Sequence, residues 1–510
     1  MARRSGVLLN ISSLPSPYGI GVLGKEAREF VDKISSMGFG IWQILPTTPI
    51  GCGNSPYASP SAFAGNVLYI DPDALVAEGL ITPEERGYAC YQGSPYTVDY
   101  DAVTAAKDNL LRAAYGRATA ELLAKVEAFG ESHPYVSCYA LFAALKDATG
   151  GKPYWEWGDY ADYGYALSKR EGIKDEYGYR LFCQYLFFTQ WAALKTYANS
   201  KGVKIFGDMP IYVSDDSAEL WARPELFQLD PKTGRPERVA GVPPDYFSED
   251  GQLWGNPLYN WKAMKEDGYS WWADRIRAGT ELYDILRIDH FRAMASYWSV
   301  PATAETAKEG KWVKGPGMPL FKALDGKYEG EIIAEDLGVF GEDVVKLLEG
   351  TGFPGMRVLQ FGFTPDEESE HLPHNYVRNT VAYTGTHDNN TLLGWLWAAS
   401  EEEREFALDY CGAAREGWQQ GGTYAPACRK LIEAVWRSVA DTVIVPLQDM
   451  CGYGSDTRMN IPGMPEGNWA FRATKDTLAA VDEAYFARLN RIFGRYSTAN
   501  TEGEAPTDEE

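Results

Sequence analysis

Four acidic residues follow short apolar runs, in positions where they could act on a bound ligand. They are Asp208 in KIFGDMP, Asp289 in LRIDHF, Glu335 in IIAEDL and Asp388 in TGTHDNNT. Two carboxyl groups about 5–5.5 Å apart can cleave a glycosidic bond with retention, one as nucleophile and the other as proton donor. A third can orient sugar hydroxyls. Any one of these acids could instead cap a helix or pair with an arginine, so the prediction of catalysis depends on the four together.

Asp289 suits the role of nucleophile because of its neighbour Arg287. Residues two apart on a strand point to the same face, so the guanidinium would lie beside the carboxylate. A fixed cation lowers the pKa of a nearby carboxyl group and holds it in place. We therefore expect Asp289 to be ionised and available for attack.

Glu335 suits the role of the acid, which must keep its proton near neutrality. It follows the apolar residues Ile332, Ile333 and Ala334, where desolvation and nearby negative charge would raise its pKa. Asp336 is the rival, but it would point to the opposite face of the strand, toward the helix layer. The sequence favours Glu335 over Asp336 on this geometric ground.

Histidines offer a hydrogen-bonding site in one place and a possible metal site in another. His387 precedes Asp388, so a donor and an acceptor for sugar hydroxyls stand together. His371 and His374 in HLPH have the spacing of metal ligands, but the proline between them disfavours a helix and no third ligand is evident. We therefore predict no metal and no cofactor.

The acids require a scaffold that brings distant strand ends together. Eight apolar runs end in polar residues and precede turn residues and helical patterns, as buried parallel strands do. The runs are 7–12, 41–46, 204–210, 284–290, 331–337, 356–362, 380–388 and 441–449. This number favours an α/β fold of the closed (β/α)8 TIM-barrel type over an open doubly wound sheet. Active sites of such barrels lie at the carboxyl ends of the strands.

The connections between the runs differ greatly in length. We predict a single catalytic barrel domain over residues 1–500, with inserted, mainly helical subdomains at about 51–203 and 211–280, because these stretches are too long for simple loops. A regular βα unit is expected at 24–38, where apolar residues recur at helical spacing before Gly38. Residues 501–510 are acidic and poor in apolar side chains, so we expect a disordered tail.

The composition of the chain indicates which partners it can bind and where in the cell it works. The chain has 71 acidic and 48 basic residues and a net charge of −23, which argues against nucleic acid or an anionic membrane. Its seven cysteines form no Cys-x-x-Cys pair, and the N-terminus lacks a hydrophobic signal region, so we expect a cytoplasmic protein. The 16 Trp and 32 Tyr could stack on sugars, although large rings also fill cores.

An ordered series of motifs along nearly the whole chain resembles a known family. The motifs are LLNISSLPSPYGIG, WQILP, GNSPYASPSAFAGN, GDMPIYV, GVPPDYFSEDGQLWGNPLYNW, LRIDHFR, AEDLG, TGTHDNNT and GNWAFR. They are similar to those of glycoside hydrolase family 77, the 4-alpha-glucanotransferases called amylomaltases or disproportionating enzymes. The resemblance implies transfer of α-1,4-glucan segments to glucose or maltooligosaccharide acceptors through a covalent glucosyl-enzyme.

The resemblance also implies roles for individual residues. Asp289 would be the nucleophile, Glu335 the acid/base and Asp388 the transition-state stabiliser. The implied substrate-binding residues are Tyr57, Asp208, Asp245, Trp254, Arg287, His387 and Asn468. The loop around Asp245 and Trp254 would partly cover the cleft and so favour a sugar acceptor over water.

Two positions depart from the family pattern. Cys52 stands where some members carry an aromatic residue, which puts a secondary glucan site in doubt. Phe471 replaces the second tryptophan of the N-W-x-W-R motif and loses its indole donor. Two alternatives stay open: an amylolytic hydrolase with the same acids, and an inactive glucan-binding protein.

Overall fold

The computed structural model describes residues 3–244, 249–338, 341–365 and 367–497. Its central sheet has eight strands, and every pair of neighbouring strands is parallel. In sheet order the strands are β10 (Gly355–Val358), β11 (Thr380–Tyr383), β12 (Thr442–Pro446), β1 (Arg4–Leu8), β2 (Ile41–Gln43), β3 (Lys204–Met209), β6 (Ile285–Ile288) and β9 (Glu331–Ala334).

The sheet curls until its two edge strands meet. The backbone N–H of Ala334, at the end of β9, donates to the carbonyl of Pro354, directly before β10, at 2.9 Å. The barrel is therefore nearly closed, and the predicted TIM-barrel class is confirmed. Each of the eight apolar runs contains or overlaps one strand, although β1 begins at Arg4, three residues earlier than predicted.

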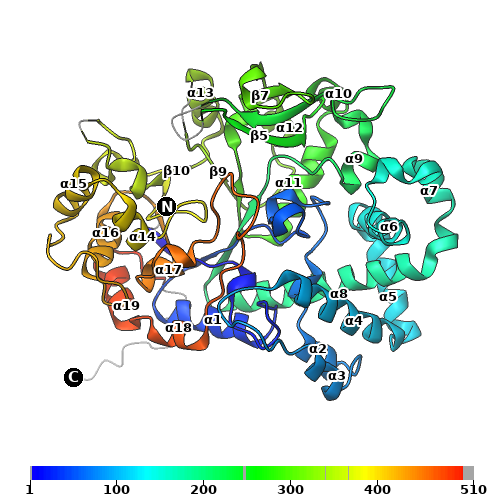
Figure 1. Cartoon of the computed structure of the whole chain (residues 1–510), viewed down its shortest axis with the longest axis horizontal. Helices are drawn as coiled ribbons and strands as arrows, with labels where there is room; N and C mark the ends of the chain where they lie inside the picture. The colour runs from blue at the N-terminus through cyan, green and yellow to red at the C-terminus, as the bar shows by residue number, and fades with distance from the viewer. Residues whose placement is uncertain (1–2, 245–248, 339–340, 366, 498–510) are drawn as a thin grey trace, which may run out of the picture.

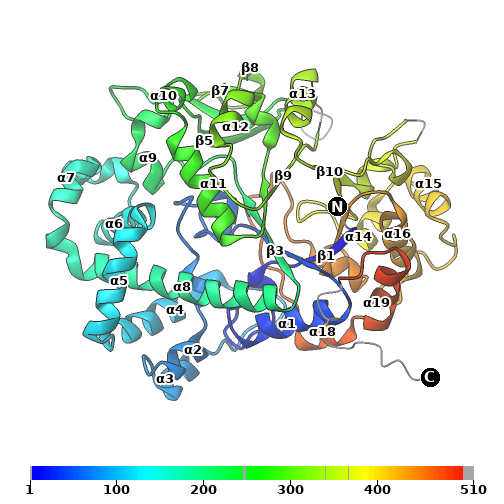
Figure 2. The same cartoon turned by 180° about the vertical axis from the view of Figure 1, so that it is seen from behind.

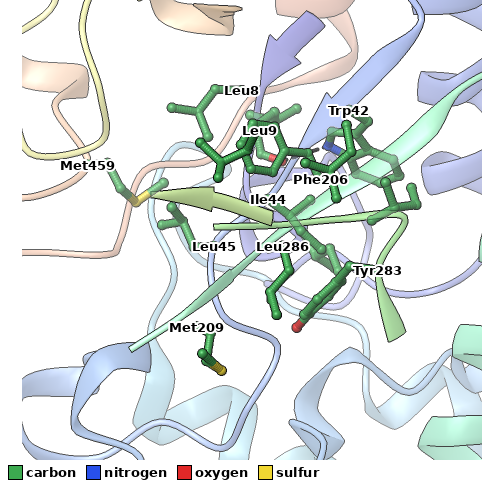
Figure 3. Packing of buried hydrophobic residues seen from close by; sticks show 14 of the residues in the cluster. Leu8, Leu9, Trp42, Ile44, Leu45, Phe206, Met209, Tyr283, Leu286 and Met459 are labelled. Atoms are coloured by element: carbon green, nitrogen blue, oxygen red, sulfur yellow. Dashed lines mark hydrogen bonds between the residues drawn. The ribbon is translucent and has the colours of Figure 1, made fainter. Parts of the chain in front are cut away.

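A hydrophobic cluster holds β1, β2, β3 and β6 together (Figure 3). Trp42 of β2 is fully buried, and its indole N–H donates to the carbonyl of Leu9 at 2.8 Å. Phe206 of β3 and Leu286 of β6 pack in the same cluster. Since each buried side chain of this size contributes about 1.5–3 kcal/mol, the strands form a firm base for the side chains at their ends.

The first βα unit forms as the apolar spacing predicts. Helix α1 (Lys25–Ser36) buries Ala27, Phe30, Val31 and Ile34 on one face. The turn after it contains Gly38 at a φ of +78°, a left-handed conformation that glycine adopts without strain. The chain then enters β2.

The stretch between β2 and β3 is helical and projects to one side of the barrel (Figure 1). Its α-helices are α2 (Pro72–Ala77), α3 (Pro83–Tyr88), α4 (Tyr100–Gly116), α5 (Ala120–Ser132), α6 (Pro134–Ala148), α7 (Tyr163–Ser168) and α8 (Lys174–Ser200). Seen from behind, α8 runs from this lobe back to α1, so it also serves as the helix that precedes β3 (Figure 2).

A second, antiparallel sheet lies over one edge of the barrel (Figure 1). Its order is β5 (Gln252–Pro257), β4 (Arg238–Val242), β7 (Ser296–Pro301) and β8 (Lys311–Lys314). The stretch 211–280 also holds α9 (Ala218–Ala222), α10 (Trp261–Glu266) and α11 (Ser270–Leu282). The sequence analysis did not foresee this sheet. Its central pairing joins Arg238 to Pro301, which stand on either side of β6, and no local pattern reports such a contact.

The remaining α-helices follow β8 and complete the outer layer. They are α12 (Met318–Leu324), α13 (Glu342–Thr351), α14 (Leu392–Ala398), α15 (Glu401–Cys411), α16 (Pro426–Arg437), α17 (Leu447–Met450), α18 (Lys475–Ala480) and α19 (Glu483–Ile492). No helix in the described part of the chain is long and apolar enough to cross a membrane. The predicted tail at 501–510 lies outside the described residues.

Candidate active site

The register of three neighbouring strands brings four charged residues together. Asp208 of β3 is paired with Arg287 of β6, and Ile288 of β6 is paired with Ala334 of β9. Neighbouring strands lie about 4.8 Å apart, so Asp289 and Glu335, the next residue on each strand, lie side by side. The barrel thus joins residues that are 46 positions apart in the chain.

Arg287 lies between two of the carboxylates. Its Nη1 is 2.7 Å from Asp208 Oδ2 and 2.8 Å from Asp289 Oδ1. Burial lowers the pKa of the Arg287 guanidinium, but Asp208 and Asp289 raise it more, so the pKa ends above its ordinary value. Arg287 therefore carries a permanent charge that orients both acids.

Asp289 is more basic than the sequence analysis predicted. Burial raises the pKa of its carboxyl group to about 6, and Asp208 and Asp388 add to the rise. Arg287 lowers this pKa, as predicted, but does not outweigh the desolvation. The Asp289 side chain keeps 28% of its surface exposed, so a ligand can reach it.

Both oxygens of Glu335 are held by backbone amides. The N–H of His290 donates to Oε2 at 2.7 Å and that of Leu337 donates to Oε1 at 2.8 Å. Burial raises the pKa of Glu335 to about 7 and Asp289 adds to it, while Arg287 and the two amides oppose the rise. The expected direction of this pKa shift is confirmed.

His290 contributes its backbone and its ring in different ways. Its φ of +48° lies in the left-handed region, which is uncommon outside glycine and directs the amide toward Glu335. Burial lowers the pKa of the imidazole to about 3, and Arg292 and Arg287 lower it further, so the ring is neutral. The ring meets Trp254 edge-on, with 4.8 Å between the ring centroids.

Asp336 faces away from the site, as expected. Its Oδ2 lies 3.0 Å from Arg357 Nη1, and its Oδ1 accepts from the backbone N–H of Met356. The carboxylate is buried. These contacts fasten the end of β9 to β10, so Asp336 has a structural function.

Asp388 and His387 approach from the turn after β11. Asp388 Oδ1 lies 3.3 Å from His387 Nε2, and 43% of the Asp388 side chain is exposed. The His387 ring stacks on Tyr57 with 5.2 Å between ring centroids. The Tyr57 hydroxyl donates to Asp208 Oδ2 at 2.7 Å, which links this turn to β3.

The other predicted substrate-binding residues have different positions. Trp254 of β5 is 37% exposed beside His290. Asp245 lies outside the described residues. Asn468 is buried, and its amide accepts from the N–H of Ile461 at 2.8 Å and donates to the carbonyl of Met464 at 2.8 Å. In this structure Asn468 therefore braces a loop.

Sequence reasoning missed several contacts to the acids. The amides of His290 and Leu337 on Glu335 have no side-chain signature. Asn460 donates to Asp388 Oδ1 at 2.7 Å from 72 residues away. The RMN run that contains it resembles no general catalytic pattern, so only the fold reveals this contact.

The two histidines of HLPH have separate partners. His371 Nδ1 accepts from the N–H of Val358 at 3.1 Å, and His374 Nδ1 bonds to the Tyr410 hydroxyl at 2.9 Å. Among the described residues, no group of three or more His, Cys, Asp or Glu side chains is arranged to hold a metal ion. Of the two departures, Cys52 is exposed and Phe471 is buried.

Comparisons with known proteins agree on one family. Residues 9–477 match the family model of the 4-alpha-glucanotransferases of glycoside hydrolase family 77. The chain is 44% identical to a 4-alpha-glucanotransferase of Thermus thermophilus, over 92% of this chain and 95% of that protein. It is 43% identical to a chloroplastic 4-alpha-glucanotransferase of Arabidopsis thaliana, over 97% of this chain and 85% of that protein.

A solved structure matches over the same extent. The amylomaltase of Streptococcus agalactiae, solved in complex with acarbose, has a TM-score of 0.92 and 39% identity, covering 97% of this chain and all of that one. The barrel, the acids at its strand ends and these matches are consistent with one another. The chain belongs to the 4-alpha-glucanotransferases of glycoside hydrolase family 77.

Proposed function

We propose that this protein transfers segments of α-1,4-linked glucan to glucose or maltooligosaccharide acceptors by a retaining double displacement. Family membership supports the reaction class. The observation that carries the mechanism is the position of Asp289 and Glu335 directly after the paired residues Ile288 and Ala334, with pKa values raised to about 6 and about 7. Such a pair holds one ionised and one protonated carboxyl group near neutral pH.

In the first step, the Asp289 carboxylate attacks the anomeric carbon of the donor sugar. The glycosidic C1–O4 bond breaks as a C1–O bond to Asp289 forms, and Glu335 gives its proton to the departing O4. The lower of the two pKa values belongs to Asp289, which supports its assignment as the anion. Asp388, exposed beside this pair, would bind the sugar hydroxyls.

In the second step, the 4-hydroxyl of an acceptor sugar attacks the same carbon. Glu335, now a carboxylate, takes the hydroxyl proton, the new C1–O4 bond forms and the ester to Asp289 breaks. Two inversions at one carbon restore the α configuration. The cycle therefore consumes no water and regenerates both carboxyl groups.

The residues around the acids would bind the reacting glucose. Tyr57 and Arg287 both bond to Asp208, and His387 stacks on the Tyr57 ring. The polar groups of this wall can donate to and accept from sugar hydroxyls. The exposed ring of Trp254 offers an apolar face on which a glucose unit can stack. We assign the acceptor side of the glucan to Trp254, because its ring contacts His290, whose backbone N–H holds Glu335.

The fold and the cysteines bear on the domain organisation and the location of the protein. They support a single catalytic domain and a reducing compartment. We include residues 1–500 in that domain, because the four-stranded sheet and the helical lobe both adjoin the eight-stranded barrel. All seven cysteines are unpaired, as is usual in the cytoplasm.

Incubation with maltotriose tests the proposal. A transferase produces free glucose together with a ladder of longer oligosaccharides, while the total number of reducing ends stays constant. An amylolytic hydrolase raises the number of reducing ends and makes no longer products. An inactive glucan-binding protein makes no products even though calorimetry detects binding. Either of the last two outcomes overturns the proposal.

A further inference from the structure

Asp388 belongs to a turn whose neighbouring residues line a small cavity. The turn follows β11, and a small cavity of about 20 Å³, room for about one water molecule, lies behind it. Thr386 and His387 line the cavity on one side, and Arg458 and Met459 line it on another. The Asp388 side chain is 43% exposed, and polar contacts hold it in place.

The segment 458–460 supplies these hydrogen bonds. Asn460 Nδ2 donates to Asp388 Oδ1 at 2.7 Å, and the backbone N–H of Asn460 donates to the carbonyl of His387 at 3.1 Å. Arg458 donates through Nη2 to the carbonyl of Asp388 and through Nε to the carbonyl of Asn460. The segment thus holds both the backbone and the carboxylate of Asp388.

The middle residue of the segment anchors it to the barrel. Met459 is buried, and its side chain extends toward Leu45 at the edge of the hydrophobic cluster (Figure 3). Its carbonyl accepts from the N–H of Trp469 at 2.7 Å. Asn468 braces the residues that follow, through Ile461. A donor tied to the core in this way keeps a fixed position relative to β11.

The bonds to Asp388 leave one carboxylate oxygen available. Asn460 donates a hydrogen bond to Oδ1, and His387 Nε2 lies 3.3 Å from the same oxygen. No hydrogen bond joins Oδ2 to another residue in the described part of the chain. A carboxylate with one oxygen held and the other open is oriented for a ligand. A hydrogen bond between an amide and a charged oxygen contributes about 1.5–3 kcal/mol.

We propose that Asn460 is a positioning residue, which orients Asp388 so that Oδ2 meets the sugar during transfer. The inference rests on the proposed function, since it assumes that Asp388 acts on the reacting glucose. Asn460 itself would act through Asp388 and would not be needed for substrate binding.

Steady-state disproportionation of maltotriose by Asn460→Ala tests this role. We expect kcat to fall about tenfold to a hundredfold, in line with loss of one charge-assisted bond, while KM changes less than about threefold. Asn379→Ala is the matched control. Asn379 stands just before β11, at its opposite end, and its side chain donates to the carbonyl of Gly352 at 3.1 Å. The control should keep the kcat and KM of the unmodified enzyme.

Asn460→Asp gives a second readout that a merely structural role would not change. It nearly preserves the side-chain shape but replaces the amide with a carboxyl group, which can donate to Asp388 Oδ1 only while it is protonated and repels that oxygen once it ionises. Relative to the unmodified enzyme at the same pH, we expect a kcat close to equal at low pH and a growing loss of kcat as pH rises, so the alkaline limb shifts to lower pH.

The outcomes separate this inference from the proposed function. If the unmodified enzyme does not disproportionate maltotriose, the proposed function fails. If it does, and Asn460→Ala keeps its kcat or raises KM alone, only the positioning role fails. A pH profile of Asn460→Asp parallel to that of the unmodified enzyme also overturns the role, whatever the fate of the alanine variant.

Discussion

Arg287 organises the acids of the site at the level of single residues. One guanidinium contacts Asp208 and Asp289, and its field also lowers the pKa of Glu335. Without it, desolvation would raise the pKa of both Asp289 and Glu335 further and favour their protonated forms. The arginine therefore allows one acid to ionise near neutral pH while its neighbour keeps a proton.

The nucleophile can be tested directly by Asp289→Asn. We expect kcat to fall at least about a thousandfold, because an amide cannot form the covalent intermediate. The melting temperature should not fall, since the substitution removes a carboxyl group whose burial is unfavourable. Asp325→Asn, at an exposed aspartate after α12, is the control and should be fully active. Undiminished disproportionation by Asp289→Asn would refute the assignment.

The pKa values of the two acids predict a bell-shaped dependence of kcat/KM on pH. Activity should decline below about pH 6, where Asp289 takes up a proton, and above about pH 7, where Glu335 loses its proton. Because Asp289 and Glu335 interact, the apparent pKa values of the acid and alkaline limbs belong to the pair of carboxyl groups together.

Glu335→Gln identifies the alkaline limb. With a glycosyl fluoride donor, whose leaving group needs no proton, this variant should still form the glycosyl-enzyme and should show no alkaline limb in that step. Persistence of the limb would assign it to another group. Mass spectrometry of the intact protein would detect the intermediate, because the variant also lacks the base for the second step.

At the level of elements, Asp449 fixes the two ends of the turn that carries His387 and Asp388. It lies in α17, where its Oδ2 accepts from Thr384 Oγ1 at 2.6 Å and its Oδ1 accepts from the N–H of Leu392 at 2.7 Å. The first bond holds the end of β11 and the second holds the start of α14. Burial raises the pKa of Asp449 to about 7.

Thr384→Val should weaken this connection. It removes the hydroxyl donor and keeps the side-chain shape, so we expect a loss of about 1–3 kcal/mol in the free energy of unfolding. The loss should be larger at pH 8 than at pH 6, because the bond to Asp449 is charge-assisted only above its pKa. Urea titrations at both pH values measure it. Thr380→Val, at the other end of β11, should show no such pH dependence, and equal losses at both pH values for Thr384→Val would contradict the prediction.

At the level of the whole molecule, the site has a cost in stability. The pKa of Glu335 is raised in the folded protein from an ordinary value of 4.5 to about 7. Below about pH 4.5 the group is protonated in both the folded and unfolded states, and above about pH 7 the folded protein contains an unfavourably buried carboxylate. Its contribution to stability is therefore lost as pH rises from about 4.5 to about 7.

Glu335→Gln should accordingly stabilise the protein more at pH 8 than at pH 5. The difference between the two pH values in the effect on the free energy of unfolding should be about 2–3 kcal/mol. Comparing each variant with the unmodified protein at the same pH cancels the contributions of other titrating groups, such as His290 and Lys107. A difference of zero would mean that Glu335 titrates in the folded protein as it does in the unfolded chain.

The barrel and its acids could be predicted because their signals are local. Strands such as β12, in which every residue is buried, read as continuous apolar runs, and the helix at 25–36 shows its buried face in its spacing. Asp289 and Glu335 directly follow such runs, and Asp388 stands in the turn after β11. The small sheet of β4, β5, β7 and β8 has no comparable signal, because its strands are partly exposed and its central pairing joins segments that precede and follow β6 in the chain.

The amino-acid sequence by itself determined which residue types follow which strands, because burial on both faces imposes apolar runs and chemistry requires acids at their ends. Only the tertiary structure decided that 289 lies beside 335 and that Asn460 contacts Asp388, since register and loop packing depend on contacts between distant segments. It also decided the pKa of Asp289. Arg287 acted as its spacing predicts, but desolvation, which depends on all surrounding groups at once, was larger.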